Sequence, residues 1–596
     1  MNGSGPAIVD TINLPGAQPL AVGVYETGNK IYVADDNSGN LIVLHGTTRE
    51  VLRTIPVGAA VFDIAVDESM GKVYTASSDD PVTTGIGDGN GLVSVIDAET
   101  DSIVTQIDPA GPDYPGKAKF FTFGHDEAHD RLYLTFQRPF GGAIGEIGAD
   151  NTFTTIGPTL AAAGVSGIEV NPVTNTAYIA YVTGNDLMVI DGSTLGVTTE
   201  DLGYTGGGSP LDIAVNEVEN KVYLTMIYVP GQGQMGILAL DRDDGSYVFR
   251  GADDLEPLTF NPATNRLFSG VQVGQHGAVV DGATDALTYV DLGGSGMGAG
   301  DVRRSTDNAY FASTDETFVV NGSTLRHRKF SAAPTGGGIF ASSVTIDQSR
   351  GLVYVVNDDH DGVITVIHDA EIPAPTLSVN DVTIAERDAG SWAATLTVSL
   401  SEKTGRDVTF HYATTPGTAT PGADYTAVAG TGTIPAESLR ASVTVPVLGD
   451  SRDEPDQTFF LVLTDPVDAT IADGRGVGTI ADDDPRAAVS IRDASTIEGD
   501  SGRHKLFFRV VLNAPSEKPV AVKFRTFDGT AKTPSDYTGQ SGTVRFAKGV
   551  TAKRVFVYVK GDRRNEPREH FLVKLQGPVN ASLADRSARG LIRDDD

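Results

Sequence analysis

The chain of 596 residues contains no cysteine and a single tryptophan. Without cysteine it can form no disulfide, no thiolate metal site, no cysteine nucleophile and no C-x-x-C-H haem attachment. No apolar run reaches the roughly 20 residues that a membrane-spanning helix needs. The first ten residues, MNGSGPAIVD, have neither the basic nor the apolar region of a signal peptide, although an exported protein with its signal removed would read the same. We therefore expect no transmembrane segment.

Basic residues are scarce over most of the chain, whose formal net charge is −33. Residues 1–373 carry 18 basic and 48 acidic side chains, and residues 374–485 carry 6 and 17. Only residues 486–596 are basic, with 21 basic and 13 acidic side chains. The large first part should repel nucleic acid, so no nucleic-acid partner is expected. The basic last part could meet an anionic cell-wall polymer, or it could simply neutralise its acidic neighbours.

One pattern of about 45 residues recurs eight times in the first part of the chain. KIYVADDNSGNLIVLHGTTREVLRTI (30–55), for example, returns as KVYTASS…GLVSVIDAETDSIVTQI (72–107). Each copy has an aromatic anchor, and neighbouring anchors are 42 to 59 residues apart. The anchors are Tyr32, Tyr74, Tyr133, Tyr178, Tyr223, Phe268, Tyr310 and Tyr354. Val, Ile and Tyr favour strands, and the Asn, Asp and Gly clusters between them favour tight turns.

Four short antiparallel strands per repeat predict the blade of a β-propeller. The eighth repeat stops at ITVIHDAE without a fourth strand, whereas the chain begins with an unassigned strand, AIVDTINL (7–14). Pairing the two would close the ring and remove its open edges. We therefore predict an eight-bladed propeller over residues 1–372, closed by strand 7–14. Because the seventh repeat (300–330) is irregular, seven blades is the alternative.

These repeats resemble the YVTN family of β-propeller repeats. The resemblance rests on stretches such as KVYTA…VSVIDAETDSIV and TAYIAYVTGNDLMVIDGSTLGV, and it covers roughly residues 7–370. It implies the architecture of the ring but not a ligand.

A second repeat follows the proline-marked linker EIPAPT (371–376). Residues 377–484 align with residues 487–596: AERDAG matches IEGDSG, GADYT matches PSDYT, GDSRDEP matches GDRRNEP, and GTIADDD matches GLIRDDD. Alternating strand-like runs lie between these segments. The pattern predicts two tandem antiparallel β-sandwiches, at 373–485 and 486–596, so the whole chain is expected to be all-β.

The segments matched between the two copies are rich in carboxylates. They lie in predicted loops or at strand ends, where a sandwich gathers them at one pole. Calcium takes 6–8 oxygen ligands, largely carboxylates and carbonyls, and clusters without His or Cys suit such a hard cation better than zinc. The alternative is that each DDD run is a solvated strand end. Because four segments recur together in two copies, we favour calcium.

This constellation looks like the Calx-β domain, a module of sodium–calcium exchangers and of many bacterial surface proteins. The resemblance implies Ca²⁺ as the cofactor and implies two ligand sets. In the first sandwich they are Glu386, Asp424, Asp450, Glu454, Asp482, Asp483 and Asp484. In the second they are Glu498, Asp536, Asp562, Glu566, Glu569, Asp594, Asp595 and Asp596.

Both copies carry features that should weaken cation binding. The first has Gln457 where the second has Glu569 and the family favours Glu, so one carboxylate is lost. The second has Arg563, Arg564 and Arg568 beside its site, and these charges should oppose a cation.

No linear motif points to catalysis. GHDEAHD (124–130) has two histidines four residues apart, but Asp126 stands where a zinc protease needs Glu, and the segment falls at a predicted turn. Residues scattered around a propeller channel could still form an active site, and the histidines to inspect are His125, His276, His327 and His360.

We therefore expect a calcium-binding protein of the bacterial cell surface or exterior, with adhesion or recognition as its role. Its propeller would be a platform for a protein or carbohydrate ligand, carried on calcium-stiffened sandwiches. The alternative is a propeller enzyme, a hydrolase or lyase, anchored by the sandwiches.

Overall fold

A computed structural model describes most of the chain. The described residues are 5–78, 91–109, 119–138, 141–160, 165–181, 186–202, 210–229, 234–251, 255, 257–270, 276–292, 297–313, 316–331, 341–357 and 362–596. All regular elements within them are β-strands, so the all-β expectation is confirmed. No described helix is long and apolar enough to span a membrane.

The chain forms two compact units, one of residues 1–374 with the short segments 403–407 and 435–438, and the other of the remaining residues of 375–596. We call residues 1–374 the ring unit and residues 375–596 the sandwich unit. The sandwich unit holds two separate hydrophobic cores, one built from residues 377–480 and the other from residues 487–592.

The described residues of the ring unit contain eight four-stranded antiparallel sheets. The first four are made, in order, by β2 (Pro19–Tyr25), β3 (Lys30–Asp35), β4 (Asn40–His45) and β5 (Val51–Pro56); β6 (Ala60–Asp67), β7 (Lys72–Ser78), β8 (Gly91–Asp97) and β9 (Ser102–Ile107); β10 (Lys119–Asp126), β11 (Arg131–Arg138), β12 (Gly141–Ile147) and β13 (Phe153–Leu160); and β14 (Val165–Asn171), β15 (Thr176–Tyr181), β16 (Asp186–Asp191) and β17 (Gly196–Asp201).

The other four sheets follow the same order. They are β18 (Pro210–Asn216), β19 (Lys221–Val229), β20 (Gln234–Asp241) and β21 (Tyr247–Gly251); β22 (Leu258–Asn261), β23 (Arg266–Ser269), β24 (His276–Asp281) and β25 (Ala286–Asp291); β26 (Ala299–Arg303), β27 (Asn308–Ala312), β28 (Glu316–Asn321) and β29 (His327–Ser331); and β30 (Ala341–Asp347), β31 (Leu352–Asn357), β32 (Val363–His368) and β1 (Ala7–Asn13).

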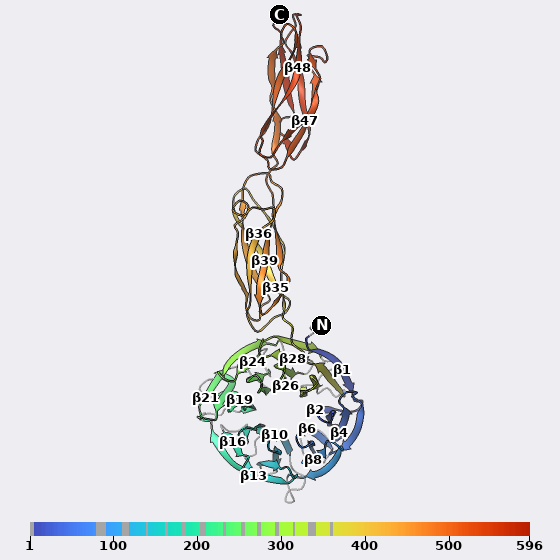
Figure 1. The fold of residues 1–596 in the computed structure, drawn as a ribbon, viewed down its shortest axis with the longest axis vertical. Coiled ribbons are helices and arrows are strands. Elements are labelled where there is room, and N and C mark those ends of the chain that lie inside the picture. The colour runs from blue at the N-terminus through green and yellow to red at the C-terminus, as the bar shows by residue number, and fades with distance from the viewer. Residues whose placement is uncertain are drawn as a thin grey trace. The chain divides into compact units, whose positions relative to one another are not determined.

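The eight sheets close on themselves. The first strand of each sheet contacts the first strand of the next, from β2 through β30, and β30 contacts β2 again. Figure 1 shows the sheets following one another around a ring. β1 pairs antiparallel with β32, from Ala7 opposite His368 to Asn13 opposite Val363. The strand at the start of the chain thus completes the last sheet.

A left-handed residue ends the first turn of every sheet. Directly before the second strand, φ is positive at Asn29, Gly71, Asp130, Asn175, Asn220, Asn265, Asp307 and Gly351. Glycine has no Cβ, and Asn and Asp tolerate this conformation better than other residues, so these turns select the Asn, Asp and Gly residues that punctuate the repeats.

Three of the aromatic anchors, Tyr32, Tyr223 and Tyr310, join neighbouring sheets through carboxylates. The buried Tyr32 hydroxyl donates to Asp101 Oδ1 (2.9 Å), which lies in a turn of the second sheet. Tyr223 donates likewise to Asp285 (2.9 Å), and Tyr310 donates to Asp369 (2.6 Å). Burial and the acceptor carboxylate raise the pKa of Tyr32 above its ordinary value, so the hydroxyl remains a donor.

Carboxylates on the first strands join the sheets in a second way. Asp212 accepts hydrogen bonds from the backbone N–H groups of Ile213 (2.8 Å) and, in the next sheet, of Leu258 (2.7 Å). Asp301 accepts from Val302 (2.7 Å) and from Ile346 of the next sheet (3.0 Å). These side chains occupy N–H groups that the unpaired edge of each first strand would otherwise leave open.

The first sandwich has two sheets, with strand orders β38-β35-β33-β40 and β34-β41-β39-β36-β37. Its strands are β33 (Thr376–Val379), β34 (Val382–Ala385), β35 (Gly390–Leu400), β36 (Val408–Pro416), β37 (Ala429–Ile434), β38 (Arg440–Gly449), β39 (Gln457–Val467), β40 (Thr470–Asp473) and β41 (Arg475–Ala481).

The second sandwich repeats this plan, with strand orders β46-β48-β44-β42-β50 and β43-β51-β49-β45-β47. Its strands are β42 (Ala488–Ile491), β43 (Ala494–Ile497), β44 (Gly502–Leu512), β45 (Val520–Asp528), β46 (Tyr537–Thr538), β47 (Ser541–Phe546), β48 (Ala552–Gly561), β49 (Glu569–Val579), β50 (Ser582–Leu583) and β51 (Ser587–Arg593).

Candidate metal centres and a cavity in the ring unit

Parallel strand pairing brings the first and last acidic segments of each sandwich together. β34 pairs in parallel with β41, with Ala385 opposite Ala481. The next residues, Glu386 and Asp482, therefore leave the sheet side by side. In the second sandwich β43 pairs in parallel with β51, with Ile497 opposite Arg593, so Glu498 and Asp594 are neighbours in the same way. Segments about 96 residues apart thus meet because of register, which the sequence pattern alone does not give.

A glycine lets the third acidic segment approach the first. Gly449 precedes Asp450, and a Cβ on it would lie 2.2 Å from the carbonyl oxygen of Arg387. The matching Gly561 precedes Asp562, and its Cβ would lie 1.9 Å from the carbonyl oxygen of Gly499. Any larger residue would push the two loops apart, which is the physical reason for glycine in both G-D turns.

The buried tyrosine of each D-Y-T motif fixes the aspartate before it. Tyr425 stacks on Phe459 in the first core, with ring centroids 4.9 Å apart, and Tyr537 stacks on Phe571 in the second at 4.3 Å. Asp536, which precedes Tyr537, is held further by a bond from the Lys560 N–H to its carbonyl (2.9 Å). Leu448 bonds Asp424 in the same way at 2.9 Å. The motif therefore places one carboxylate beside the G-D turn.

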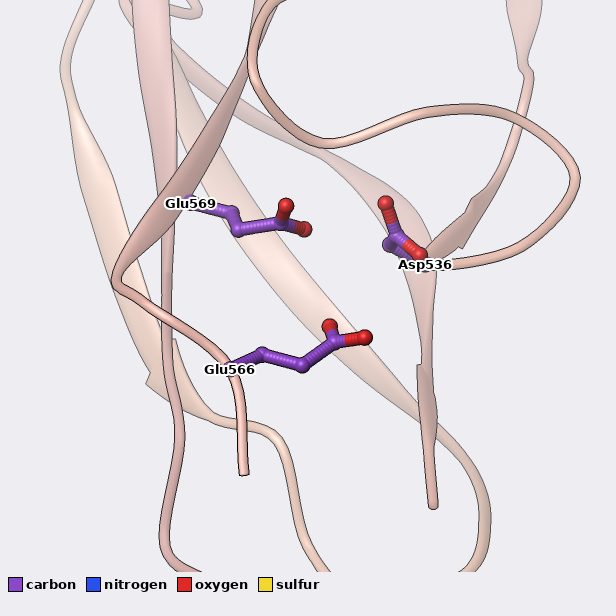
Figure 2. A group of neighbouring side chains, drawn as sticks. All are labelled: Asp536, Glu566 and Glu569. Atoms are coloured by element: carbon purple, nitrogen blue, oxygen red, sulfur yellow. The ribbon is translucent and has the colours of Figure 1, made fainter. Parts of the chain in front are cut away.

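Three carboxylates of the second sandwich converge. Oxygens of Asp536, Glu566 and Glu569 all lie within 4.8 Å of one another, and Figure 2 shows the three side chains pointing toward one centre. Burial and the adjacent Asp536 raise the pKa of Glu569. Three carboxylates at this separation repel one another unless a proton or a cation lies between them.

The matching place in the first sandwich lacks one charge. Asp424 and Glu454 correspond to Asp536 and Glu566, and Gln457 replaces Glu569. The amide Nε2 of Gln457 donates to Glu454 Oε2. A neutral donor therefore replaces the third carboxylate, as the sequence analysis notes, and this should lower the affinity for a cation there.

A second group of carboxylates lies deeper at each pole. Glu386 is only 4% exposed, and burial together with Asp450, Glu454, Asp482 and Asp484 raises its pKa to about 7. Glu498 is 8% exposed, and burial together with Glu566, Asp562, Asp594 and Asp536 raises its pKa to about 7. In the first sandwich burial, Asp450 and Asp424 also raise the pKa of Glu454, so acids from four segments share one electrostatic environment in each sandwich.

The donors present fit calcium. Asp484 Oδ1 is buried and has no hydrogen-bond partner among the described residues, and burial with nearby carboxylates raises the pKa of Asp484 to about 6. A buried oxygen without a donor is costly unless a cation or a proton satisfies it. Each cluster offers only oxygen atoms from carboxylates, with loop carbonyls nearby, and this suits Ca²⁺ better than a transition metal.

The middle aspartate of each DDD run has a backbone partner. Asp483 Oδ1 accepts from the N–H of Arg387 (2.8 Å), and Asp595 Oδ1 accepts from the N–H of Gly499 (2.8 Å). Each bond ties the final acidic run to the loop after the first Glu. One oxygen of each of these two side chains is therefore already engaged.

Sequence reasoning left out four residues that act at these poles. Asp388 contributes to the raised pKa of Asp484. Asp500 contributes, after partial desolvation, to the raised pKa of Asp596. Their shared position in AERDAG and IEGDSG was a usable signal. No sequence signal marked Asp453 and Lys518, because these two residues meet only through the tertiary structure.

Lys518 of the second sandwich neutralises part of the first pole. Its ammonium lies 2.8 Å from Asp482 Oδ2 and 2.7 Å from Asp453 Oδ1, and Asp453 is 3% exposed. Asp453 also accepts from the Ser516 hydroxyl (3.1 Å). A cation held in place by the neighbouring sandwich therefore competes with any metal for one oxygen of Asp482.

The expected arginines beside the second pole are exposed. Arg563 Nη2 lies 3.4 Å from Asp500 Oδ2, and its side chain is 78% exposed. Arg564 and Arg568 are exposed as well. Water and salt screen such charges, so their opposition to a cation is weak.

The ring unit holds a separate polar cavity of about 810 Å³. Carboxylates are the commonest titratable groups on its wall. These groups belong to the acids Glu127, Glu169, Glu217 and Asp301 and to the bases Arg304 and His125. Glu169 is exposed to water. Even so, desolvation inside the cavity and the nearby Asp212 raise its pKa to about 8. Apolar contacts come from Val170, Val215 and Phe260. The cavity suits a small ligand with a positive charge and an apolar stem.

The histidines within the described residues do not assemble a zinc site. His125 Nε2 lies 3.0 Å from Asp67 Oδ2, whereas His129 Nδ1 pairs with Asp126 (3.0 Å) after the end of β10. GHDEAHD is therefore the strand end and turn that its sequence indicates. His276 lies on β24 and His327 on β29, and neither lines the cavity; His360 lies outside the described residues.

Comparisons with known proteins concern the sandwich unit. Residues 371–495 and 482–596 each match the model of the Calx-beta domain. Sodium/calcium exchanger 3 of Mus musculus is 24% identical over 199 residues, 30% of this chain and 21% of the exchanger, so the chain spans about a fifth of that relative. The C-terminal part of the chain therefore contains two Calx-beta domains.

Solved structures similar to this part include two from Calx. The crystal structure of CBD12 from CALX1.2 is 18% identical, covering 37% of this chain and all of that one, with a TM-score of 0.19. The apo-form Calx CBD1 domain is 26% identical, covering 19% of this chain and 99% of that one, with a TM-score of 0.17.

Exchanging Gln457 and its counterpart Glu569 should move calcium affinity in opposite directions. Gln457→Glu restores the third carboxylate of the first sandwich and should tighten calcium binding there by about tenfold, whereas Glu569→Gln should weaken the second sandwich by a similar factor. Isothermal titration calorimetry of the two variants and the parent measures this. Equal affinities in all three would contradict a metal role for these positions.

Without calcium, the sandwich unit should lose stability as the pH rises. Glu386 and Glu498 have folded pKa values of about 7, well above the ordinary value of about 4.3. Between these values the folded state holds protons that the unfolded chain releases, so the free energy of unfolding falls as pH increases and levels off above about 7. Thermal melts in chelator at pH 5, 6, 7 and 8 test this. A melting temperature that increases over that range would show the sign to be wrong.

Proposed function

We propose that this protein is a calcium-binding protein of the bacterial cell surface or exterior, in which the Calx-beta domains carry and stiffen a ligand-binding ring. The observation that carries the proposal is the carboxylate cluster at the pole of each sandwich. Both clusters bring together four sequence segments, burial and neighbouring carboxylates raise the pKa of Glu386 and of Glu498, and in the first cluster the buried Asp484 Oδ1 has no hydrogen-bond partner within the described residues.

Calcium would satisfy both clusters. In the first sandwich Glu386, Asp424, Asp450, Glu454, Asp482 and Asp484 would hold it, with Asp483 supporting the loop. In the second, Glu498, Asp536, Asp562, Glu566, Glu569, Asp594 and Asp596 would do so, with Asp595 in the supporting place. Because these clusters exist only in the folded state, bound calcium stabilises the fold.

An exterior location agrees with this chemistry. The chain contains no cysteine, and extracellular calcium modules work with dissociation constants of about 10⁻⁴–10⁻³ M. Gln457 and Lys518 each reduce the electrostatic attraction of the first sandwich for a cation, which suits a site that fills at such concentrations. The location itself is part of the proposal.

The ring unit is, in this proposal, an eight-bladed β-propeller of the YVTN type. Its eight four-stranded sheets and the pairing of β1 with β32 support eight blades rather than the alternative of seven. The irregular seventh repeat still supplies four strands, β26 to β29. Such a ring is a rigid platform on which a protein or carbohydrate ligand can bind.

A binding role is better supported than a catalytic one. The Ser69 hydroxyl beside the cavity donates to Asp67 (2.6 Å), and His125 pairs with that same Asp67. No hydroxyl donates to His125 among the described residues, so Ser69 is not activated as a nucleophile there. The hydrolase or lyase alternative gains no support from this cavity.

Calcium titration tests the proposal directly. Calorimetric titration of the chelator-stripped protein should give saturable binding. Asp482→Ala/Asp483→Ala should abolish the calcium binding of the first sandwich. Asp594→Ala/Asp595→Ala should abolish that of the second. Saturating calcium at 100 times the dissociation constant should add about 2.7 kcal/mol of stability per site. If calcium gives no heat of binding and does not change the melting temperature, the proposal is wrong and the acidic runs are solvated strand ends.

The ring cavity should prefer a cation. We expect tetralysine to bind it, with an affinity that rises between about pH 7 and 9, because Glu169, with a pKa raised to about 8, gains its negative charge over that range. Glu169→Gln should weaken binding and flatten the pH profile, whereas Glu50→Gln, an exposed site elsewhere on the ring unit, should change neither. Fluorescence anisotropy of labelled tetralysine reports both. Identical profiles for the parent and Glu169→Gln would exclude this cavity.

A further inference from the structure

One sheet of the second sandwich presents a face built from cations and aromatic rings. On β44 and β48 every second side chain points outward, and these side chains meet across the strands in pairs. The pairs are Arg503 with Lys560, Lys505 with Tyr558, and Phe507 with Phe556. We call these six residues the basic–aromatic stripe. Arg509 and Arg554 form the next pair and extend its charge.

Rings and cations in the stripe are held in fixed relation to one another. Arg503 Cζ lies 4.7 Å from the Tyr558 ring centroid, and Lys505 Nζ lies 4.3 Å from that of Phe556. Phe556 contacts Phe507 and Tyr558 edge to face, at 6.1 and 5.2 Å. Cation–π contact and edge-to-face packing restrain these side chains before any ligand arrives.

The stripe is open to solvent and carries no compensating acid. Phe507 is 51% exposed, and Arg503, Lys505, Arg509 and Arg554 are exposed. Neither β44 nor β48 contains Asp or Glu. No carboxylate lies within 4.0 Å of the stripe's cations among the described residues. Such exposed charges and rings are an unusual surface for a strand pair that serves only as a spacer.

The first sandwich supplies an internal comparison for the stripe. At the matched positions of β35 and β38 the paired residues are Ser391 with Leu448, Ala393 with Pro446, Thr395 with Thr444, and Thr397 with Ser442. None is charged or aromatic. The same sheet therefore folds without these side chains, so the fold does not require the stripe.

We propose that the basic–aromatic stripe binds an acidic polysaccharide, with the ammonium and guanidinium groups engaging its carboxylates and Phe507 contacting the apolar face of a sugar ring. Cations two residues apart on one strand stand about 6.8 Å from each other, in a row that a linear polyanion can follow. The stripe belongs to the basic last domain, and none of its six residues is a proposed calcium ligand.

Single-stranded nucleic acid fits the stripe less well. Successive bases stack on several free ring faces, whereas Arg503 and Lys505 already cover those of Tyr558 and Phe556, so within the stripe only Phe507 is left to receive a base. The chain as a whole carries a net charge of −33, which repels the dense phosphates of a nucleic acid more than a polymer with one carboxylate per sugar.

Polygalacturonate tests the proposal, with affinity electrophoresis of the full chain in chelator at low salt as the measurement. The parent should bind polygalacturonate and should not bind its methyl ester. Arg503→Ser/Lys505→Ala introduces the residues of the first sandwich and should weaken binding by about tenfold, because each exposed ion contact contributes up to about 1 kcal/mol. Phe507→Thr should weaken it as well. Because calcium is absent, failure here leaves the calcium proposal untouched.

A charge-matched control separates the stripe from net charge. Arg545→Ala/Arg589→Ala removes two exposed positive charges from the opposite sheet and should change the affinity by less than about twofold. The proposal is wrong if this control loses as much as the stripe variant, if the methyl ester binds equally well, or if the parent does not bind polygalacturonate. Tighter binding of oligothymidylate would assign the stripe to nucleic acid instead. Self-association that Arg503→Ser/Lys505→Ala abolishes would assign it to a second copy of this chain.

Discussion

The structure depends on how each buried carboxylate is satisfied. In the ring unit Asp101, Asp212 and Asp301 accept hydrogen bonds from a tyrosine hydroxyl or from backbone N–H groups of a neighbouring sheet, and these bonds join the sheets. At the poles of the sandwiches the carboxylates face one another instead. A charge without a donor is costly in a protein interior, so the same chemical group is structural in one unit and a candidate metal ligand in the other.

The two sandwiches use one fold for two different surfaces. Their register, their glycines at the G-D turns and their stacked D-Y-T tyrosines coincide, and so do their acidic poles. Their exposed sheets differ, because the first presents Thr, Ser and Ala where the second presents Lys, Arg and Phe. The acidic poles suit a cation and the basic–aromatic stripe suits an anion, so one small domain can bear both kinds of site at different places.

The junction between the sandwiches joins one acidic pole to the neighbouring domain. Lys518 and Ser516 of the second sandwich bond Asp453, and Lys518 also reaches Asp482. A change in the occupancy of the first pole therefore acts on a residue of the next sandwich. The second pole, which lies at the far end of β51, has no such partner among the described residues, so the two sites are expected to differ in affinity even where their ligands match.

The sequence by itself determined the repeats, the strands and the acidic segments. Alternating β-branched residues, clusters of Asn, Asp and Gly that favour tight turns, and a spare first strand indicated four-stranded sheets and the pairing of β1 with β32. These patterns can be recognised from the sequence because they depend on residues that are neighbours along the chain. Only the tertiary structure decided which carboxylates meet, because that depends on the parallel register of β34 with β41 and of β43 with β51. Lys518 beside Asp482, the cavity around Glu169 and the stripe across β44 and β48 each join distant segments, and no local pattern encodes such contacts.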